Sequence, residues 1–370
     1  MKKINLKIKS APFFPLMVVI SIASFALLIM YSISSGNFFP WCFKQFFRLI
    51  LGVVILFLTI SLKLSFWKKY AYAFYGFCLI MLIFVAIAGK VSMGAQRWLN
   101  FYFFNFQPSE LMRIFLVIAL AKYFSCISVA QTKKMSSLFI PTILTGIPML
   151  LVLLQPDLGT AMLLFFVCVS IFFVCGVQIW KFLIAFIIAL ISAPIMWSML
   201  HEYQRNRILM FLSPEMDPSG AGYHIIQSQI ALGSGGFWGK GLMNGSQCQL
   251  NFLPEKQTDF VFAALGEELG FIGCLILIIL YGILLTYNLN VALRARSKFN
   301  QILVFGLNAM LFFYIFINIS MVCGLLPVVG IPLPFFSYGG SALIVLMFCQ
   351  GLIFAADIEQ RSAVGIRYSA

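Results

Sequence analysis

LGTAMLLFFVCVSIFFVCG, residues 158–176, carries no acidic or basic side chain. A helix needs about 20 apolar residues to cross a hydrocarbon core about 30 Å thick, and this stretch has that length. Similar apolar blocks recur at 13–34, 46–65, 70–89, 107–125, 138–155, 180–200, 259–287, 301–324 and 340–359. We therefore predict an all-α integral membrane protein of about ten transmembrane helices, built as a single polytopic membrane domain over residues 1–370.

The composition argues against several other classes of protein. The chain is 62% hydrophobic and only 10% charged, which leaves too little polar surface for a water-soluble globule. A membrane β-barrel would instead show alternating segments of about ten residues. The net charge of +14 is spread over many inter-helix loops, so we expect no nucleic-acid partner. The nine cysteines show no CxxC pair or metal-ligand spacing and are expected to be buried apolar residues.

The basic residues predict the orientation of the chain. They gather in alternate loops, and by the positive-inside rule those loops are cytoplasmic, together with both termini. The apolar run from Phe13 to Ser34 is too long for the core of a cleaved signal peptide and is expected to be an uncleaved first helix. Two informative loops then face outward, at 90–106 and 201–258. The longer one contains GSGGFWGKG and lacks the composition of a disordered linker, so we expect an ordered external lid.

Asp259 stands out among the acidic residues, in NFLPEKQTDFVFAALGEELG at 251–270. It lies where the long loop ends and the eighth span begins, which places a carboxylate at the external mouth of a helix. Asp259, Ala263, Gly266 and Gly270 share one helix face, a strip of small residues that can serve as the wall of a groove. A cap on the eighth helix is an equally good interpretation of the aspartate.

The remaining acidic residues near the spans favour structural roles. Glu267 and Glu268 lie about 12 Å deeper than the aspartate and need partners, so structural pairing is favoured over catalysis. Asp157, in the motif QPDLGT, is expected to cap span six at the external surface. Glu110 and Arg113, in the motif QPSELMR, are three residues apart and are expected to form an ion pair that braces a cavity.

Two further segments have compositions suited to a binding site. GIPLPFFSYGGS, at 330–341, is typical of irregular backbone at the rim of a cavity. Positive charge in the long external loop suits phosphate binding, although a solvated loop surface is the simpler explanation. The residues that carry this charge are Arg205, Arg207, Lys240 and Lys256.

Together these motifs resemble the SEDS family (shape, elongation, division and sporulation), and its RodA elongation glycosyltransferases more than its FtsW division enzymes. The matching segments follow the family order across nearly the whole chain: GAQRWLNFYFFNFQPSELMR (94–113), QPDLGTAM (155–162), RNRILMFLSPEMDPSGAGYH (205–224), ALGSGGFWGKG (231–241), FLPEKQTDFVFAALGEELG (252–270) and GIPLPFFSYGGSALI (330–344). The forms GAQRW and GIPLP favour the RodA type. Two positions depart from the family pattern, since Gln257 replaces the usual histidine before Thr-Asp and Arg113 replaces the usual lysine of the PSE motif.

The resemblance implies an extracellular fourth loop and a peptidoglycan glycosyltransferase that joins lipid II units into glycan strands during cell elongation. It assigns the catalytic carboxylate to Asp259. We expect this residue to act as general base on the 4-hydroxyl of an acceptor GlcNAc, in an inverting attack that expels undecaprenyl diphosphate from the donor. Residues expected to contact the substrate are Arg97, Trp98, Arg205, Arg207, Lys240, Lys256, Glu255, Ser337 and Tyr338. Residues expected to shape the cavity are Glu110, Arg113, Gln155, Asp157 and Glu267.

The resemblance also implies a partner and a location. The partner is a class B penicillin-binding protein with one transmembrane helix, which crosslinks the strands, and the location is the bacterial cytoplasmic (inner) membrane. A divalent cation, Mg²⁺ or Mn²⁺, is a candidate cofactor for stabilising the leaving diphosphate. Two other functions stay open: a flippase that moves lipid II across the bilayer, and a noncatalytic scaffold for cell-wall synthases.

Overall fold

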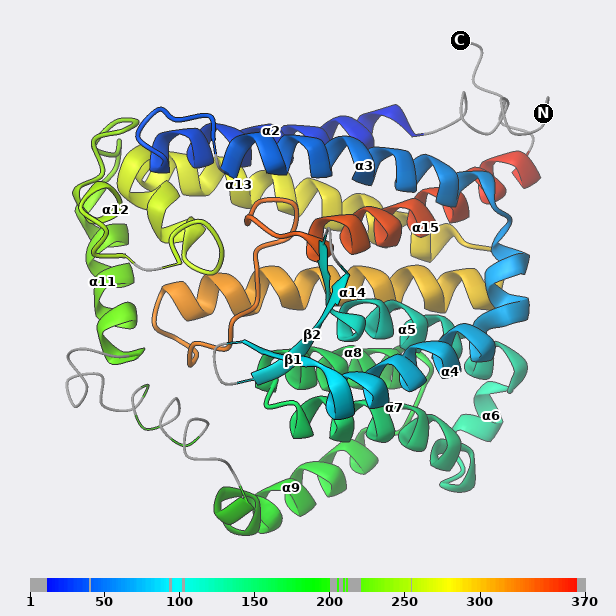
Figure 1. Cartoon of the computed structure of the whole chain (residues 1–370). Coiled ribbons are helices and arrows are strands. Elements are labelled where there is room, and N and C mark those ends of the chain that lie inside the picture. Colours follow the sequence, from blue (N-terminus) through cyan, green and yellow to red (C-terminus); the bar gives the residue numbers. More distant parts are fainter. Residues whose placement is uncertain are drawn as a thin grey trace.

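The computed structural model describes residues 12–39, 41–92, 95–101, 104–199, 205, 209, 211, 221–253 and 255–364. This part of the chain contains ten long helices; nine of them pack together in a bundle, and the helix at 179–199 lies along one edge of the molecule, apart from the rest (Figure 1). They are α2 (Phe13–Ile33), α3 (Trp41–Ser61), α4 (Leu64–Ala88), α5 (Pro108–Cys126), α7 (Ser136–Leu154), α8 (Leu158–Val174), α9 (Ile179–Met199), α13 (Val261–Arg294), α14 (Lys298–Val322) and α15 (Ser341–Val364). The predicted fold class, a helical membrane protein of about ten spans, is confirmed.

The helices differ in length and hydropathy, and therefore in how clearly each can be recognised as a transmembrane span. Among the described residues, seven are long and apolar enough to cross a membrane: α2, α3, α4, α7, α13, α14 and α15. Helix α8 and the first part of α9 are shorter apolar helices. Helix α5 carries Glu110 and Arg113, but both side chains are buried among neighbouring helices. The bundle therefore shields these charges from lipid, which is where intramembrane charges are tolerated.

The break between α3 and α4 lies earlier than the sequence predicts. Helix α3 begins at Trp41 and α4 at Leu64, rather than at residues 46 and 70. The reason is that a break of two residues, ending at Lys63, is enough to separate the helices. Lys68 and Lys69 therefore lie inside α4, where long side chains of this type can reach the water boundary.

The loop at 90–106, which is expected to face outward, contains a small antiparallel sheet that the sequence analysis did not predict. The strands are β1 (Lys90–Ser92), β2 (Ala95–Phe101) and β3 (Phe104–Phe106), in that spatial order. Trp98 pairs with Lys90 across the first two strands, and Leu99 pairs with Phe106 across the second pair. Strand pairing thus satisfies backbone groups that a plain loop would leave to water.

Helix α14 lies at the centre of the bundle, packed against α5, α8, α13 and α15. Helix α15 also packs along α3, where glycines permit close approach: a Cβ at Gly52 would lie 2.8 Å from a side chain of α15, and one at Gly351 2.9 Å from a side chain of α3. Asn288 of α13 and Gln350 of α15 donate to each other at 3.3 and 2.9 Å. These contacts, small residues and paired amides, are the usual means of helix association within lipid.

The two ends of the bundle differ in their connections. The long loop contributes α11 (Ala221–Ser234) and α12 (Ser246–Gln249), and α11 lies across the end of the bundle where α13 begins (Figure 1). Helix α2 begins and α15 ends at the opposite end, and the short α6 (Val129–Thr132) joins α5 to α7. The expected external loop and the expected cytoplasmic ends thus lie at opposite ends of the spans.

Candidate active site

The long loop packs directly onto the first turns of α13. A Cβ at Gly235 would collide with the carbonyl oxygen of Gly266, and one at Gly239 would collide with that of Glu268. Gly270 has φ +64 and interrupts the helical geometry beneath the same loop. The small-residue strip predicted as a groove wall therefore receives the loop, because only glycine lets two backbones approach this closely.

Glu267 anchors this loop through a carboxylate that is completely buried. Lys240 Nζ forms an ion pair with its Oε1 at 2.7 Å. The backbone N–H groups of Gln247 and Cys248 donate to the same carboxylate at 2.9 and 3.2 Å, and Ser246 Oγ donates at 3.2 Å. Glu267 is therefore a structural partner of the loop, as the sequence favours, and the ammonium of Lys240 is held by it.

We expect Glu267→Ala to loosen the loop, since it leaves an ammonium and two backbone N–H groups without their acceptor. The free energy of unfolding is expected to fall by about 2 kcal/mol. This is below the range for fully buried ion pairs, because Lys240 reaches water. Limited trypsin digestion of the purified protein should then cut within 235–253 faster than in the unmodified chain. Ser246→Ala, which removes one donor of the four, is the matched control and should change the digestion little. Equal digestion of Glu267→Ala and the unmodified chain would contradict the anchor.

Asp259 lies in the turn that leads into α13 and is partly exposed. The N-cap residue of the helix is Phe260, and Asp259 lies one residue before it. The alternative interpretation of Asp259 as the N-cap of the helix is therefore wrong. Its Oδ2 faces Gly330, because a Cβ built on that glycine would lie 3.5 Å from it. The carboxylate thus faces the 330–341 segment, and its residue lies two positions before α13, which begins at the end of the bundle that carries the long loop (Figure 1).

The 330–341 segment is irregular, as predicted, and it holds the turn before α13. Tyr338 N donates to the carbonyl oxygen of Gln257 at 2.8 Å, and Ser337 Oγ donates to that of Thr258 at 2.6 Å. Ser337 is buried, and its hydroxyl also accepts from the N–H of Leu333 at 2.7 Å. Its hydroxyl is therefore bonded within the protein, and the substrate contact predicted for Ser337 stays a prediction.

Arg48 of α3 is a polar residue of this region that the sequence analysis missed. Its guanidinium lies 4.5 Å from the ring centroid of Tyr338, and a Cβ on Gly340 would lie 3.7 Å from it. Its Nη1 is buried and has no hydrogen-bond partner. The available signal was a lone arginine in the apolar block 46–65, because ionisable residues at membrane depth are rare and usually functional.

The predicted ion pair between Glu110 and Arg113 is not formed. Arg113 Nη2 instead donates to Thr160 Oγ1 of α8 at 2.8 Å, and its guanidinium lies 5.0 Å from the ring centroid of Tyr314. Its Nε and the Oε2 of Glu110 are buried without a partner. The correction has a geometric cause: Arg113 reaches across to neighbouring helices, which a spacing rule for one helix surface does not consider.

Asp157 caps α8, as predicted, by accepting from the backbone N–H of Thr160 at 3.2 Å. Arg97 of β2 donates to the carbonyl oxygens of Gln155 and Pro156 and lies 3.9 Å from Asp157 Oδ1. Gln155 Nε2 in turn donates to the carbonyl oxygen of Leu82 at 2.8 Å. Arg97 thus joins the small sheet to the α7–α8 turn, and Trp98 beside it is partly buried.

The remaining predicted phosphate ligands contact the protein itself. Lys256 Nζ donates to the carbonyl oxygen of Cys248 and to Asn251 Oδ1, and burial lowers the pKa of this ammonium below its ordinary value. Arg205 donates to carbonyl oxygens at the end of α9, those of Trp197 at 2.9 Å and Ser198 at 2.6 Å. These contacts do not support phosphate binding by Lys240, Lys256 or Arg205, and Arg207 lies outside the described residues.

Glu255 is exposed and lies four residues before Asp259. Its Oε2 accepts from Thr258 Oγ1 at 3.0 Å, and its φ of +48 marks a strained turn for a residue with a side chain. In the described part of the chain, no group of three or more His, Cys, Asp or Glu side chains could hold a metal ion. The described residues therefore do not form a metal site built from protein ligands alone.

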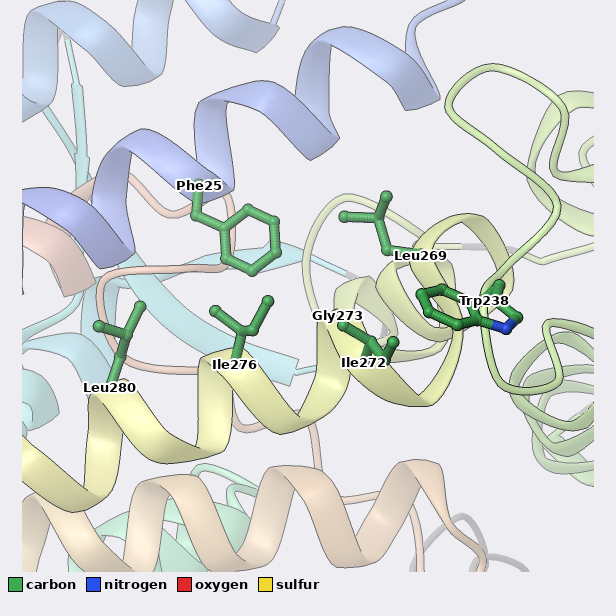
Figure 2. A pocket seen from close by; sticks show the side chains of 7 residues that line it. All are labelled: Phe25, Trp238, Leu269, Ile272, Gly273, Ile276 and Leu280. Atoms are coloured by element: carbon green, nitrogen blue, oxygen red, sulfur yellow. The ribbon is translucent and has the colours of Figure 1, made fainter.

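An apolar groove of about 420 Å³ runs along the first half of α13. Figure 2 shows Phe25 of α2 on one side and Trp238 of the long loop at one end, with α13 side chains between them. The α13 residues that line it are Leu269, Ile272, Gly273, Ile276 and Leu280. Phe25 also packs edge-on against Phe336, with ring centroids 5.6 Å apart, so the groove adjoins the 330–341 segment.

Residues 6–362 match the sequence profile of the FtsW, RodA and SpoVE family, described as cell cycle proteins. The chain belongs to this family. It is 42% identical over 349 residues to the peptidoglycan glycosyltransferase MrdB of Escherichia coli K12, which covers 94% of this chain and 93% of that protein. It is 34% identical to the probable peptidoglycan glycosyltransferase FtsW of Geobacter sulfurreducens strain DL-1/KN400, over 94% of this chain and 95% of that one.

Solved structures of this family share the fold. A chain from a peptidoglycan synthase complex that coordinates polymerization and crosslinking superposes with a TM-score of 0.82 at 30% identity, over 95% of this chain and 98% of the other. The rod shape determining protein RodA of Thermus thermophilus superposes with a TM-score of 0.72 at 27% identity, over 98% of this chain and 99% of the other. Nearly the whole FtsW/RodA/SpoVE fold is therefore present in this chain.

Proposed function

We propose that this protein is a peptidoglycan glycosyltransferase that joins lipid II units into glycan strands during cell elongation. The observation that carries the proposal is the place of Asp259: a partly exposed carboxylate against Gly330, at the loop-bearing end of a membrane bundle. The names of the relatives, peptidoglycan glycosyltransferases over more than nine-tenths of this chain, support the same activity. An ionised carboxylate in this position can take a proton from a sugar hydroxyl.

The chemistry needs one base and a good leaving group. Asp259 removes the proton from the 4-hydroxyl of the acceptor GlcNAc, and that oxygen forms a bond to the anomeric carbon of the donor MurNAc. The bond from this carbon to the diphosphate breaks, and undecaprenyl diphosphate leaves with the electron pair. Because diphosphate leaves readily, the acid that glycosidases use to protonate their leaving group is not required.

Arg48 and Arg113 are the cations best placed to receive the diphosphate. Each has a buried guanidinium nitrogen without a hydrogen-bond partner, which is costly unless a ligand supplies an acceptor. One short segment adjoins both regions, because Tyr338 stacks on Arg48 and Ser341 lies beside Glu110, three residues from Arg113. A guanidinium binds phosphate oxygens through two parallel hydrogen bonds, and this geometry suits a diphosphate.

We propose a divalent cation only as an ion that binds together with the substrate, through its diphosphate. Mg²⁺ is commonly held by one or two carboxylates together with substrate phosphates, which needs no cluster of protein ligands. No step above depends on the ion. Polymerisation assayed with and without chelator tests this part separately.

The apolar groove between α2 and α13 is the proposed path for a polyprenyl tail. Its lining side chains are apolar, and it adjoins the 330–341 segment through Phe25 and Phe336. Ile276 lines the groove and its side chain is exposed, so a larger side chain there would narrow the groove. We expect Ile276→Trp to raise the KM for lipid II several-fold with little change in kcat, since it would weaken binding of the tail equally in the ground state and the transition state.

The topology proposal places both termini in the cytoplasm and the site at the outer face of the bacterial inner membrane. The distribution of Lys and Arg supports this orientation. A class B penicillin-binding protein with one transmembrane helix is the proposed partner. The similarity to a chain from a synthase complex that coordinates polymerization with crosslinking supports it.

One experiment separates the proposed enzyme from a flippase or a scaffold. Purified protein is reconstituted in proteoliposomes with labelled lipid II, with and without the partner and with chelator. The proposal predicts labelled glycan polymer. Exchange of lipid II between leaflets without polymer would favour transport, and neither signal, under conditions where the partner binds, would favour a scaffold.

Gly330→Ala tests the position of the carboxylate. Gly330 has φ +71, where a residue with a side chain costs about 1–2 kcal/mol, so the backbone that faces Asp259 Oδ2 is expected to shift. We expect kcat to fall about tenfold, because a small displacement of a reacting group is costly. Gly282→Ala is the control, since a Cβ there meets open space. An unchanged kcat in Gly330→Ala would contradict the contact.

A further inference from the structure

Three successive carbonyl oxygens before α13 accept hydrogen bonds from other elements. Those of Gln257 and Thr258 accept from the 330–338 segment, at 2.8 and 2.6 Å. The third, that of Asp259 itself, accepts from Asn318 Nδ2 of α14 at 3.0 Å. The backbone that carries the carboxylate is therefore fixed at every residue of this tripeptide.

Asn318 makes the bond that joins the turn to its neighbour. Its amide nitrogen also donates to the carbonyl oxygen of Ile331 at 2.7 Å, so both of its protons are used. The side chain is completely buried within a membrane helix, and its Oδ1 has no hydrogen-bond partner, so its two donated bonds hold it in place. One amide thus bridges the residue that bears the carboxylate and the residue after Gly330, which the carboxylate faces.

Ser337 supplies the second bond, and it is itself held in place. Its own carbonyl oxygen accepts from Gln45 Nε2 of α3 at 3.1 Å. Its hydroxyl bridges Thr258 and Leu333, as described above. The clamp therefore has supports on α14 and on α3, and neither lies on the helix that follows Asp259.

We infer that Asn318 and Ser337 form a clamp that positions the Asp259 carboxylate for proton transfer, so that loosening it lowers turnover rather than substrate affinity. They are positioning residues, because they act on the backbone of Asp259. The inference rests on the proposed role of that carboxylate. The proposed lipid II contacts, Arg48, Arg113 and the α2–α13 groove, make no bond to either side chain, so we expect the apparent affinity for substrate to change less than turnover.

The test compares clamp variants with a buried asparagine of the same helix. Asn318→Leu removes both bonds of the amide, and Ser337→Ala removes the bond to Thr258. Asn308→Leu is the matched control, because Asn308 Nδ2 donates to the carbonyl oxygen of Leu285 at 3.2 Å, away from the clamp. Initial rates of lipid II polymerisation are measured over a range of substrate concentrations, per mole of monodisperse protein, beside the melting temperature.

Asn318→Leu is expected to lower kcat about 10- to 100-fold and Ser337→Ala about fivefold, both with KM within about twofold of the unmodified protein. Asn308→Leu should lower the melting temperature by a similar amount and leave kcat within about twofold. In the double clamp variant the fold-decrease in kcat should be smaller than the product of the two single fold-decreases, because both side chains hold one backbone segment.

The inference is overturned if both clamp variants keep kcat within about twofold, or if Asn308→Leu loses as much kcat as Asn318→Leu. Asp259→Asn is measured beside them. Activity in that variant would rule out Asp259 as the base. An inactive Asp259→Asn together with fully active clamp variants would rule out only the clamp.

Discussion

Asp259→Asn should polymerise lipid II at least about 100-fold more slowly than the unmodified protein, because an amide cannot accept the proton of the acceptor hydroxyl. General bases contribute about 10²- to 10⁴-fold to reaction rates, and no other acidic side chain in the described turn at 255–260 occupies the same place, since Glu255 lies one turn away and is exposed. The substitution keeps the size of the side chain and the backbone bond to Asn318, so the protein should remain folded. Product length and rate are measured with purified lipid II in detergent and in liposomes.

The control for this change is Asp357→Asn, at the opposite end of the bundle. Asp357 pairs with Arg361 at 2.7 Å and accepts from Tyr287 at 2.6 Å, so it is a buried carboxylate with a structural role. Its amide variant should keep polymerisation within about twofold. If Asp259→Asn also keeps its activity, Asp259 is not the base.

Arg48→Gln should give the second large loss, about 100-fold in kcat/KM. The reason is that a guanidinium with a buried, unpartnered Nη1 is the best candidate to stabilise the charge on the departing diphosphate, and losing one such donor costs about 10²- to 10³-fold in other enzymes. Arg48→Lys should recover little, because an ammonium cannot stack on Tyr338 and bind phosphate through two bonds at once.

Lys44→Gln is the matched control for Arg48, since Lys44 lies one turn earlier on α3 and is exposed. It should leave kcat/KM nearly unchanged at moderate salt. A wild-type rate in Arg48→Gln would assign the diphosphate to Arg113 or to residues outside the described part of the chain. An equal loss in both variants would point to a general effect of surface charge.

The sequence predicts the spans well because each one is a property of its own residues. Apolar blocks of the right length become helices wherever lipid is the solvent, and the ten predicted blocks correspond to ten long helices in the described chain. Helix ends are less well predicted, as at α4, because a break of two residues is invisible to a window of about nineteen. The small sheet was missed because its strands are short and gain their stability from pairing.

The site was predicted only where the chain marks it locally. Asp259 is visible as an acidic residue at a loop-to-helix boundary. Lys240, by contrast, pairs with Glu267, 27 residues later. No local sequence pattern distinguishes a lysine in such an ion pair from a lysine that is available to bind phosphate. Arg48 and Asn318 were missed because their partners lie far away in the sequence. Arg48 contacts Tyr338, about 290 residues later, and Asn318 donates to two separate turns, at Asp259 and Ile331.

The most direct measurement is the structure of Asp259→Asn bound to lipid II in the acceptor position. Proton transfer requires the side chain at 259 to lie about 2.6–3.2 Å from the 4-hydroxyl of the acceptor GlcNAc, on the outer side of the membrane. The account predicts this contact, with the diphosphate of a donor near Arg48. A bound acceptor whose 4-hydroxyl lies far from residue 259, or a side chain that faces away from the sugar, would contradict it.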